Sequence, residues 1–182
     1  MEMRTFDNSI RRNSLCAAFA ALLLVLAFSL SAAGDRAPVE AAFGDDCEAL
    51  LVREIGRAEK DIVVAIYSIT RRNITAALAE AVERGVKVRL KYDAGSAADT
   101  DDMKSAIRYL RKQGVKCEAI AMSDAYGKMH HKFTVIDGKR VLTGSYNYTS
   151  SATSANDENI VLIESPDIAK EFSTEFERIK SK

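Results

Sequence analysis

Apolar residues recur along the chain with two different spacings. Apolar positions three or four residues apart, the spacing of one helix face, predict helices that begin at Asp45 or Asp46, at Asn73, over 103–112 and at Ser165-Pro166. Short apolar and β-branched runs predict strands at 62–69, 86–92, 115–120, 133–136, 140–143 and 160–163. Asp137-Gly138 separates two of these strands and predicts a tight hairpin turn.

Two of the predicted helices lead into a strand through the same three residues, Gly-Val-Lys, at 85–87 and 114–116. At 85, the glycine stands where the end of a helix favours a left-handed residue. Helices that alternate with strands in this way are typical of crossovers between parallel strands. We therefore expect an α/β fold with a mixed, largely parallel sheet flanked by helices, an α-β-α sandwich.

The first 33 residues have the composition of a targeting segment. Three arginines precede an apolar run at 15–30, and the small residues at 31–33 fit a cleavage site, which predicts a signal peptide over 1–33. The run is close to the roughly 18 residues that cross a bilayer, so a membrane anchor over 15–33 is the alternative. In both cases the domain is exported, and we expect a periplasmic or secreted protein unless the anchor is retained.

The rest of the chain is balanced in charge and has enough apolar residues for one compact domain. Of 182 residues, 47% are hydrophobic and 29% are charged, with 26 basic and 26 acidic residues. We predict a linker over 34–42 and the functional domain over 43–182. Net neutrality argues against a general electrostatic affinity for nucleic acid, so any recognition of phosphate has to be local.

Cys47 and Cys117 are the two cysteines of the expected exported domain. An oxidising compartment allows a disulfide between them if their Cα atoms come within about 7 Å. The alternative is that both are small buried hydrophobic residues. The sequence does not decide between these two interpretations.

The candidate chemistry is concentrated around the predicted hairpin. His130 and Lys132 are two residues apart on a strand and project to one side, whereas His131 projects to the other. The hairpin returns the chain so that Ser145 and Asn147 can approach the same place. A nucleophile or base, a cation, a hydroxyl and an amide donor are together suited to phosphoryl transfer.

The spacing of these residues resembles a known family signature. His130, Lys132, Asp137, Gly144, Ser145 and Asn147 match the pattern H-x-K-x4-D-x6-G-S-x-N of the phospholipase D superfamily at every fixed position. Residues 43–180 as a whole resemble the small, exported bacterial endonucleases of that superfamily that carry one motif. The resemblance implies the phospholipase D/nuclease fold.

The resemblance also implies roles for individual residues. His130 would attack phosphorus and form a phosphohistidine, while Lys132 and Asn147 would hold the phosphate oxygens with Ser145 beside them. Glu158 resembles the family carboxylate that accepts a hydrogen bond from the ring of the nucleophilic histidine. Asp137 belongs to the motif, but its place in the turn indicates a structural role.

The number of histidines has a consequence for assembly. A second histidine is needed to protonate the leaving oxygen and then to activate water, yet the chain has only two histidines and His131 faces away. Larger members of the superfamily carry two motifs in one chain. The resemblance therefore implies a homodimer with the active site at its two-fold interface.

Further residues near the motif are candidates for substrate binding. Arg71, Arg72 and Lys128 could form a local positive rim, and Tyr146 could stack on bases or pack in the core. The basic residues of the strand 86–92 could follow a phosphate backbone or form a solvated face. We expect no metal ion and no other cofactor, because adjacent histidines on a strand cannot readily bind one ion and the cysteines lack ligand spacing.

Three functions fit these observations. The first is a metal-independent phosphodiesterase that acts on nucleic acid, as a nonspecific endonuclease of DNA or also of RNA. The second keeps the chemistry but acts on phospholipid, with the uncleaved N-terminus at a membrane. The third is a catalytically inactive dimeric module that binds nucleic acid, against which the complete motif argues.

Overall fold

The computed structural model describes residues 37–124 and 126–182. The predicted signal peptide or anchor and residues 34–36 of the predicted linker lie outside this range. Ala37–Lys182 forms one compact unit. In the described part of the chain, no helix is long and apolar enough to cross a membrane.

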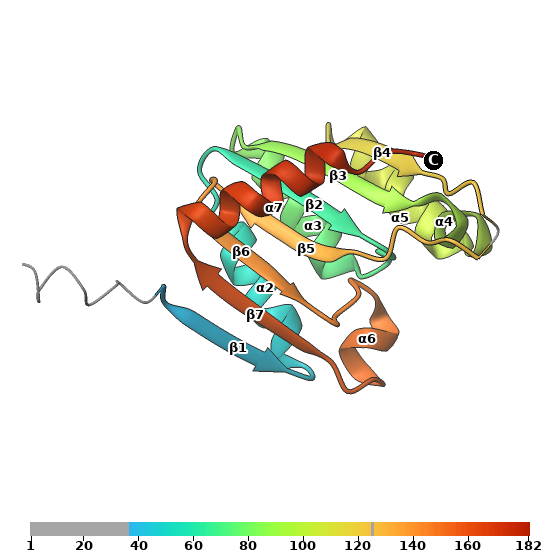
Figure 1. Ribbon diagram of the computed structural model, residues 1–182. Coiled ribbons are helices and arrows are strands. Elements are labelled where there is room, and N and C mark those ends of the chain that lie inside the picture. The colour runs from blue at the N-terminus through green and yellow to red at the C-terminus, as the bar shows by residue number, and fades with distance from the viewer. Residues whose placement is uncertain (1–36, 125) are drawn as a thin grey trace, which may run out of the picture. The chain divides into compact units, whose positions relative to one another are not determined.

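A seven-stranded mixed sheet forms the centre of this unit (Figure 1). Its order is β1-β7-β6-β5-β2-β3-β4, with the bounds β1 Val39–Phe43, β2 Asp61–Ile66, β3 Lys87–Asp93, β4 Lys116–Ile120, β5 Lys132–Ile136, β6 Arg140–Gly144 and β7 Asn159–Glu164. Only β2, β3 and β4 pair in parallel, and the other four pairings are antiparallel. The predicted mixed α/β sheet is confirmed, but its parallel part is smaller than expected because the C-terminal half runs back and forth through the hairpin.

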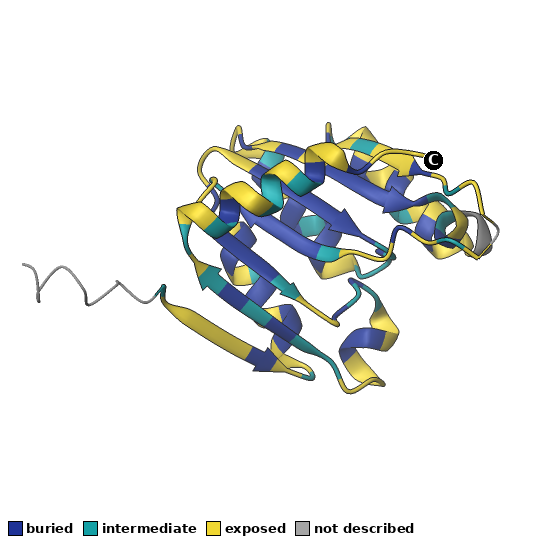
Figure 2. Cartoon of the chain, in the orientation of Figure 1, coloured by how far each residue is buried: buried dark blue, intermediate teal, exposed yellow. Residues whose placement is uncertain are grey.

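Helices cover both faces of the sheet, as predicted for an α-β-α sandwich. The helices are α2 Asp46–Gly56, α3 Arg72–Glu83, α4 Ala94–Asp99, α5 Asp101–Lys112, α6 Ser150–Ser154 and α7 Pro166–Arg178. The larger core packs α2, α3 and α5 against one face, and the smaller core packs α7 against the other. Figure 2 shows the buried residues of the central strands between these layers. Ser165 caps α7 and Pro166 occupies its first turn, as predicted.

The N-terminal edge of the sheet differs from the prediction. Residues 39–42 were expected to be linker, but Val39–Phe43 is a strand that pairs antiparallel with β7. Only Ala42 in this strand is buried, while Val39 is 64% and Phe43 68% exposed. The strand therefore depends on the hydrogen bonds offered by the edge of β7 rather than on an apolar pattern, which explains why periodicity misses it.

The predicted hairpin between β5 and β6 is confirmed. Asp137 and Gly138 both have positive φ, at 56° and 62°, as the two central residues of a type I′ turn require. The Asp137 carboxylate accepts hydrogen bonds from the backbone N–H groups of Glu59, Lys60 and Asp61 and from Arg140. Asp137 thus ties the hairpin to the start of β2, in keeping with its predicted structural role.

The disulfide alternative for Cys47 and Cys117 is wrong. Cys47 is fully buried in α2, where its Sγ lies 3.4 Å from the carbonyl oxygen of Ala42 in β1, whereas Cys117 lies in β4. Because β1 and β4 are the two outer strands of the sheet, these residues are on opposite sides of the domain and are not bonded to each other. Burial raises the pKa of the Cys117 thiol to about 11.

The basic side of β3 is covered by the end of α7. Lys91 is buried and donates its ammonium to the carbonyl oxygen of Ile179, and Arg89 forms an ion pair with Glu177 at 2.7 Å. Both cations also lie over the ring of Phe176. Arg89 and Lys91 therefore hold α7 on the sheet and do not form a path for a phosphate backbone.

Candidate active site

The two halves of the motif meet at one edge of the sheet, where β2 ends and β5 begins. Lys132 is the first residue of β5 and is paired with Ile66, the last residue of β2. The N–H of Tyr67 donates to the carbonyl oxygen of His131, which extends the pairing by one step. These backbone bonds fix the direction in which the side chains of the motif project.

The two histidines project to opposite sides of the sheet, as the strand period predicts. The ring of His130 packs against the ring of Tyr67, with 4.8 Å between the centroids. The Nε2 atom of His131 lies 3.5 Å from Glu175 in α7, and its ring contacts Phe133 edge-on. His131 thus belongs to the contact with α7, and His130 alone stands in the candidate site of this chain.

Lys132 lies directly beside His130. Its Nζ is 3.3 Å from Nδ1 and 3.2 Å from Nε2 of the ring, and it also donates to the carbonyl oxygen of His130 at 3.2 Å. Burial lowers the pKa of His130 below its usual value, and the charge of Lys132 lowers it further. The ring is therefore more readily neutral near pH 7, which leaves a ring nitrogen lone pair for a nucleophile.

Burial also lowers the pKa of Lys132, while the nearby carboxylate of Glu158 opposes this effect. The ammonium remains the charged group closest to the His130 ring, because it contacts both ring nitrogens. A cation at this position can stabilise negative charge that develops on phosphate oxygens.

Asp93 is a residue of the site that the sequence reasoning missed. Its buried carboxylate accepts hydrogen bonds from the N–H of Ser96 at 2.7 Å and from the N–H of Met129 at 2.9 Å. It therefore holds the backbone one residue before His130, and its negative charge opposes the lowering of the pKa of His130. Its position at the carboxyl end of a parallel strand, where α/β sheets commonly bind ligands, is the signal that could have identified it.

Ser145 and Glu158 form the other side of the motif. Ser145 donates its hydroxyl to Glu158 at 2.5 Å and accepts the N–H of Asn159 at 3.1 Å. The second carboxylate oxygen of Glu158 accepts a hydrogen bond from the side chain of Asn156 at 3.1 Å. Within the described residues, the hydrogen bonds of the Glu158 carboxylate are to Ser145 and Asn156, and the bond to the His130 ring that the resemblance implies is not among them.

Gly144 is a glycine because β6 and β7 come very close at this point. A Cβ atom at 144 would collide with the carbonyl oxygen of Asn159 and would lie 2.9 Å from its Oδ1. The same asparagine carbonyl accepts the N–H of Ser145 at 3.1 Å. The close approach therefore brings Ser145 and Glu158 within hydrogen-bond distance.

Asn147 lies between two buried tyrosines in the segment that follows β6. Its Oδ1 atom is buried and has no hydrogen-bond partner in the part of the chain that the structure describes. Leaving such an atom unsatisfied costs on the order of 1–3 kcal/mol, a cost that is more often found at functional sites. The amide oxygen of this motif residue is therefore free to accept a hydrogen bond from a donor outside the described residues.

Tyr146 is packed in the core and does not present its ring to a base. It is buried, and its hydroxyl lies 2.6 Å from the hydroxyl of Thr153. Tyr148 is buried as well and is bonded to Thr134. Of the two interpretations for Tyr146, packing in the core is confirmed, because the segment after β6 turns the ring inward onto α2 and α6 residues rather than toward the surface.

The three basic candidates do not point to one place, although Arg71 and Arg72 both line the groove described below. Arg71 is turned to α2, where it forms an ion pair with the buried Glu48 at 2.9 Å. Arg72 is exposed at the start of α3. Lys128 is also exposed, and it lies near Gly95, two residues after Asp93 in the chain. They do not form one continuous rim.

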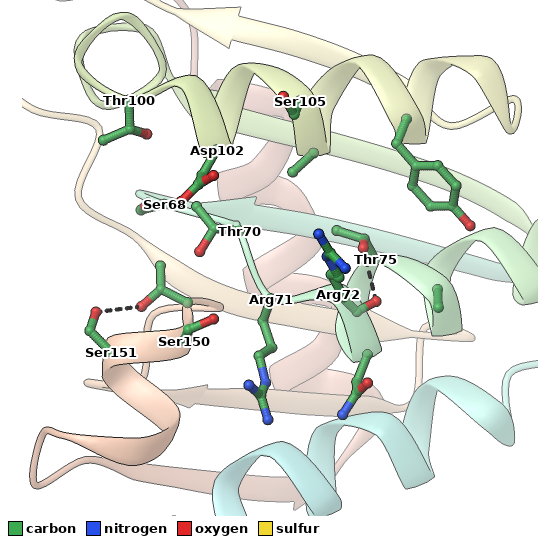
Figure 3. A pocket seen from close by; sticks show the side chains of 15 residues that line it. Ser68, Thr70, Arg71, Arg72, Thr75, Thr100, Asp102, Ser105, Ser150 and Ser151 are labelled. Atoms are coloured by element: carbon green, nitrogen blue, oxygen red, sulfur yellow. Dashed lines mark hydrogen bonds between the residues drawn. The ribbon is translucent and has the colours of Figure 1, made fainter.

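A polar groove of about 1100 Å³ lies on the α3 and α5 side of the sheet (Figure 3). Eight of its fifteen lining residues are serine or threonine, and both Arg71 and Arg72 belong to the lining. Two of its lining residues are close to the candidate site in the chain, since Ser68 follows Tyr67, the partner of His130, and Thr149 lies two residues after Asn147, but no residue of the motif lines the groove. Across residues 37–124 and 126–182, no group of three or more acidic, histidine or cysteine side chains is arranged to hold a metal ion.

An α-β-α sandwich with one H-x-K-x4-D-x6-G-S-x-N motif at the edge of its sheet defines a class of phosphoryl-transfer domains. Residues 51–180 match the family described as cardiolipin synthase, PLD-like domain. The chain belongs to this PLD-like family of the phospholipase D superfamily.

Curated relatives show the same relationship. The chain is 37% identical over 123 residues to the mitochondrial cardiolipin hydrolase of Xenopus tropicalis, which covers 68% of this chain and 56% of the relative. It is 35% identical over 127 residues to the phospholipase D of Rickettsia prowazekii. This aligned segment covers 69% of this chain and 58% of the relative. The chain thus spans less than two thirds of the length of these relatives.

A solved structure extends the similarity over a whole chain. The phospholipase D family member Nuc from Salmonella typhimurium superposes with a TM-score of 0.73 at 26% identity. The match covers 79% of this chain and 94% of the Nuc chain. The predicted superfamily and its fold are therefore confirmed.

Proposed function

We propose that this protein is a metal-independent phosphodiesterase that cleaves the phosphodiester bonds of nucleic acid through a phosphohistidine at His130. The observation that carries the proposal is the contact of Lys132 with both ring nitrogens of His130, where β2 ends and β5 begins. Partial desolvation and this cation lower the pKa of His130, which favours the neutral, nucleophilic form of the ring.

In the proposed reaction a ring nitrogen of His130 forms a bond to phosphorus while the bond from phosphorus to the leaving oxygen breaks. The leaving oxygen takes up one proton. Water then attacks phosphorus, the phosphorus–nitrogen bond breaks, and the proton lost by the water replaces the one given to the leaving oxygen. Lys132 stabilises the negative charge of the phosphate oxygens in both steps.

The proton donor is proposed to come from a second copy of the chain. His131 is turned to α7 by its contacts with Glu175 and Phe133. A homodimer with its two-fold axis at the site would place the His130 of the second copy opposite the first, where one acts as nucleophile and the other as general acid and base.

Dimerisation at the site can be tested by mixing. Wild-type protein and His130→Ala protein are unfolded together in equal amounts and refolded. If a site needs both copies of His130, about a quarter of the activity remains, because only that fraction of dimers contains two intact copies. If each chain instead carries an independent site, about half remains. Full activity of a protein that light scattering shows to be monomeric would contradict the dimer.

Nucleic acid is the substrate that the polar groove beside the motif favours, because hydroxyl groups and arginines suit sugars and phosphates better than acyl chains. Phospholipid is the second candidate, since the two curated relatives are named cardiolipin hydrolase and phospholipase D.

The predicted signal peptide adds the proposal that the enzyme acts in the periplasm or outside the cell, or at a membrane if residues 15–33 are retained.

Parallel cleavage assays in excess EDTA decide between these substrates. Plasmid DNA, RNA and vesicles of cardiolipin or phosphatidylcholine are incubated with the wild-type protein, with His130→Ala and with His131→Ala as the matched control. We expect DNA cleavage that His130→Ala abolishes and His131→Ala retains. Cleavage that stops when EDTA is added, or release of lipid head groups without DNA cleavage, would contradict the proposal.

A further inference from the structure

The groove on the α3 and α5 side neighbours the candidate site through the segment that follows Tyr67, although no residue of the motif lines it. Its nearest lining residues, Ser68 and Thr149, adjoin Tyr67 and Tyr148, and the N–H of Tyr148 donates to the carbonyl oxygen of Ser68 at 3.1 Å. This proximity makes the groove a candidate path for the units next to a phosphate at His130. The volume of about 1100 Å³ exceeds the range of roughly 300–1,000 Å³ that is common for pockets of single small molecules.

The charges of the groove are unevenly distributed. Figure 3 shows Arg71 turned away toward α2, where Glu48 pairs with it, and Arg72 extended toward α5. Among the described residues, Arg72 has no ion-pair partner. Asp102 is the one acid of the lining and stands on the α5 wall. A phosphate is therefore attracted to the Arg72 side and repelled from the Asp102 side.

The α5 wall offers groups that suit a base and a sugar. Asp102, Ser105 and Tyr109 follow one another at i, i+3 and i+7 on one helix face and line the groove together. Tyr109 is the one aromatic residue of the lining and is 41% exposed. An exposed ring can stack on an unpaired base, and a carboxylate and a hydroxyl can hydrogen-bond to polar base edges.

Several hydroxyls of the groove are also available to a ligand. The hydroxyls of Thr75 and Thr149 are used within the protein, by the carbonyl oxygen of Arg72 and by Ser151 and the N–H of Ala152. Those of Thr70, Ser105 and Ser150 make no hydrogen bond in the described ranges. Apart from Tyr109, the lining holds only two alanines as apolar residues, so it has no large aliphatic side chain to pack on an acyl chain.

We propose that this groove binds the unpaired nucleotides next to the cleaved phosphodiester, with Arg72 at a backbone phosphate and Tyr109 stacked on a base. This assignment rests on the proposed nuclease function and extends it to two specificity-determining residues that do not touch the reacting atoms. It implies that nucleotides beyond the cleaved bond contribute to binding but not to the chemical step.

The experiment compares two substrates in EDTA. One is a single-stranded DNA oligonucleotide, and the other is bis(para-nitrophenyl) phosphate, which contains a phosphodiester but no flanking nucleotides. We expect Arg72→Ala and Tyr109→Ala each to raise KM for the oligonucleotide roughly fivefold or more, as loss of one stacked base or phosphate contact does. Both variants keep the wild-type kcat/KM for the small diester.

Matched controls separate the contacts. Arg108→Ala removes an exposed arginine of α5 outside the groove, and Tyr109→Phe retains the ring, so both should keep the oligonucleotide KM of the wild type. Arg72→Ala should also reduce the dependence of log KM on log salt concentration by about 0.7, the effect of one phosphate contact on a single strand, whereas Tyr109→Ala should not.

The outcomes distinguish this proposal from the function on which it rests. If the wild type cleaves the oligonucleotide and both variants keep its KM, the groove assignment is wrong while the nuclease function stands. If the wild type cleaves phospholipid vesicles and not the oligonucleotide, the nuclease function fails and the assignment fails with it. A rise in KM that Arg108→Ala reproduces would indicate general charge attraction and would also overturn the assignment.

Discussion

The ammonium of Lys132 lies at nearly equal distances from the two ring nitrogens of His130, 3.3 Å from Nδ1 and 3.2 Å from Nε2. A cation on the in-plane lone pair of one ring nitrogen would be much further from the other nitrogen. Lys132 therefore stands over the ring, and it acts on His130 through its charge more than through a directed hydrogen bond. The lone pair of the ring remains available to phosphorus.

This relationship predicts how the pKa of His130 depends on Lys132. Lys132→Met removes a charge that lowers the pKa of His130, so we expect this pKa to rise toward its usual value, although burial continues to lower it. Titration of the ring protons by NMR measures the change, and His131→Gln assigns the signals because the chain has only two histidines. An unchanged pKa in Lys132→Met would contradict the electrostatic role.

Substitution of Asp93 should change the pKa of His130 in the direction opposite to substitution of Lys132. In Asp93→Asn the negative charge that raises the pKa of His130 is lost, so the pKa falls and the acid limb of kcat/KM moves to lower pH. One of the two backbone N–H groups, of Ser96 or Met129, also loses its acceptor, which lowers the free energy of unfolding by about 1–3 kcal/mol.

The pH profile separates a positioning residue from a structural one. A purely structural Asp93 would lower stability in Asp93→Asn and leave the acid limb of kcat/KM in place. Asp101→Asn is the matched control, because Asp101 is an exposed aspartate in the first turn of α5. It should change neither the pH profile nor, beyond a few tenths of a kcal/mol, the stability.

The sequence predicts the parts of the fold that depend on local physics. The type I′ turn at Asp137-Gly138 and the cap at Ser165 follow from the conformations that these residues favour, and both are confirmed. The edge strand Val39–Phe43 is not predictable in this way, because only its partner β7 makes it a strand. Asn73 does not cap α3, whose cap position is Arg71, because the chain enters the helix two residues earlier than its apolar pattern begins.

The candidate site likewise contains relationships that the sequence predicts and contacts that it does not. His130 and Lys132 share a side because a strand has a period of two, and this relationship is visible in the sequence. The contacts of His130 with Tyr67 and of the neighbouring Met129 with Asp93 join residues that are far apart in the chain. The hydrogen bond between Glu158 and Ser145 likewise depends on the approach of β6 to β7 and not on a local sequence pattern.

Gly144 gives a prediction about that approach. In Gly144→Ala the new Cβ collides with the backbone of Asn159, which a strand pair cannot relieve without moving. We expect the free energy of unfolding to fall by about 1–3 kcal/mol. We also expect kcat to fall by a larger factor than stability alone explains, because the contact between β6 and β7 at Gly144 positions the hydrogen bond between Ser145 and Glu158. Gly56→Ala is the control, since nothing lies within 4 Å of a Cβ there.

Thermal unfolding and kcat together test this prediction. Gly56→Ala should keep both the Tm and the activity of the wild type, and a small rise in Tm is expected because alanine favours a helix more than glycine does. Wild-type activity in Gly144→Ala would show that the spacing between β6 and β7 does not position the Ser145 hydroxyl.

Asp137 lies at the opposite end of β5 from His130, so its loss should affect stability and not the chemical step. Asp137→Asn removes the charge that accepts three backbone N–H groups and Arg140, at a cost of about 2 kcal/mol. Burial raises the pKa of Asp137, but these backbone hydrogen bonds outweigh it, so the pKa of Asp137 in the folded protein lies below its pKa in the unfolded chain.

The carboxylate therefore stabilises the fold above its unfolded pKa, and this contribution is lost as pH falls through the lower folded pKa. Denaturant titrations at several pH values should show the wild type and Asp137→Asn converging in acid, whereas a constant difference, or a loss of kcat at pH 7, would refute the structural role.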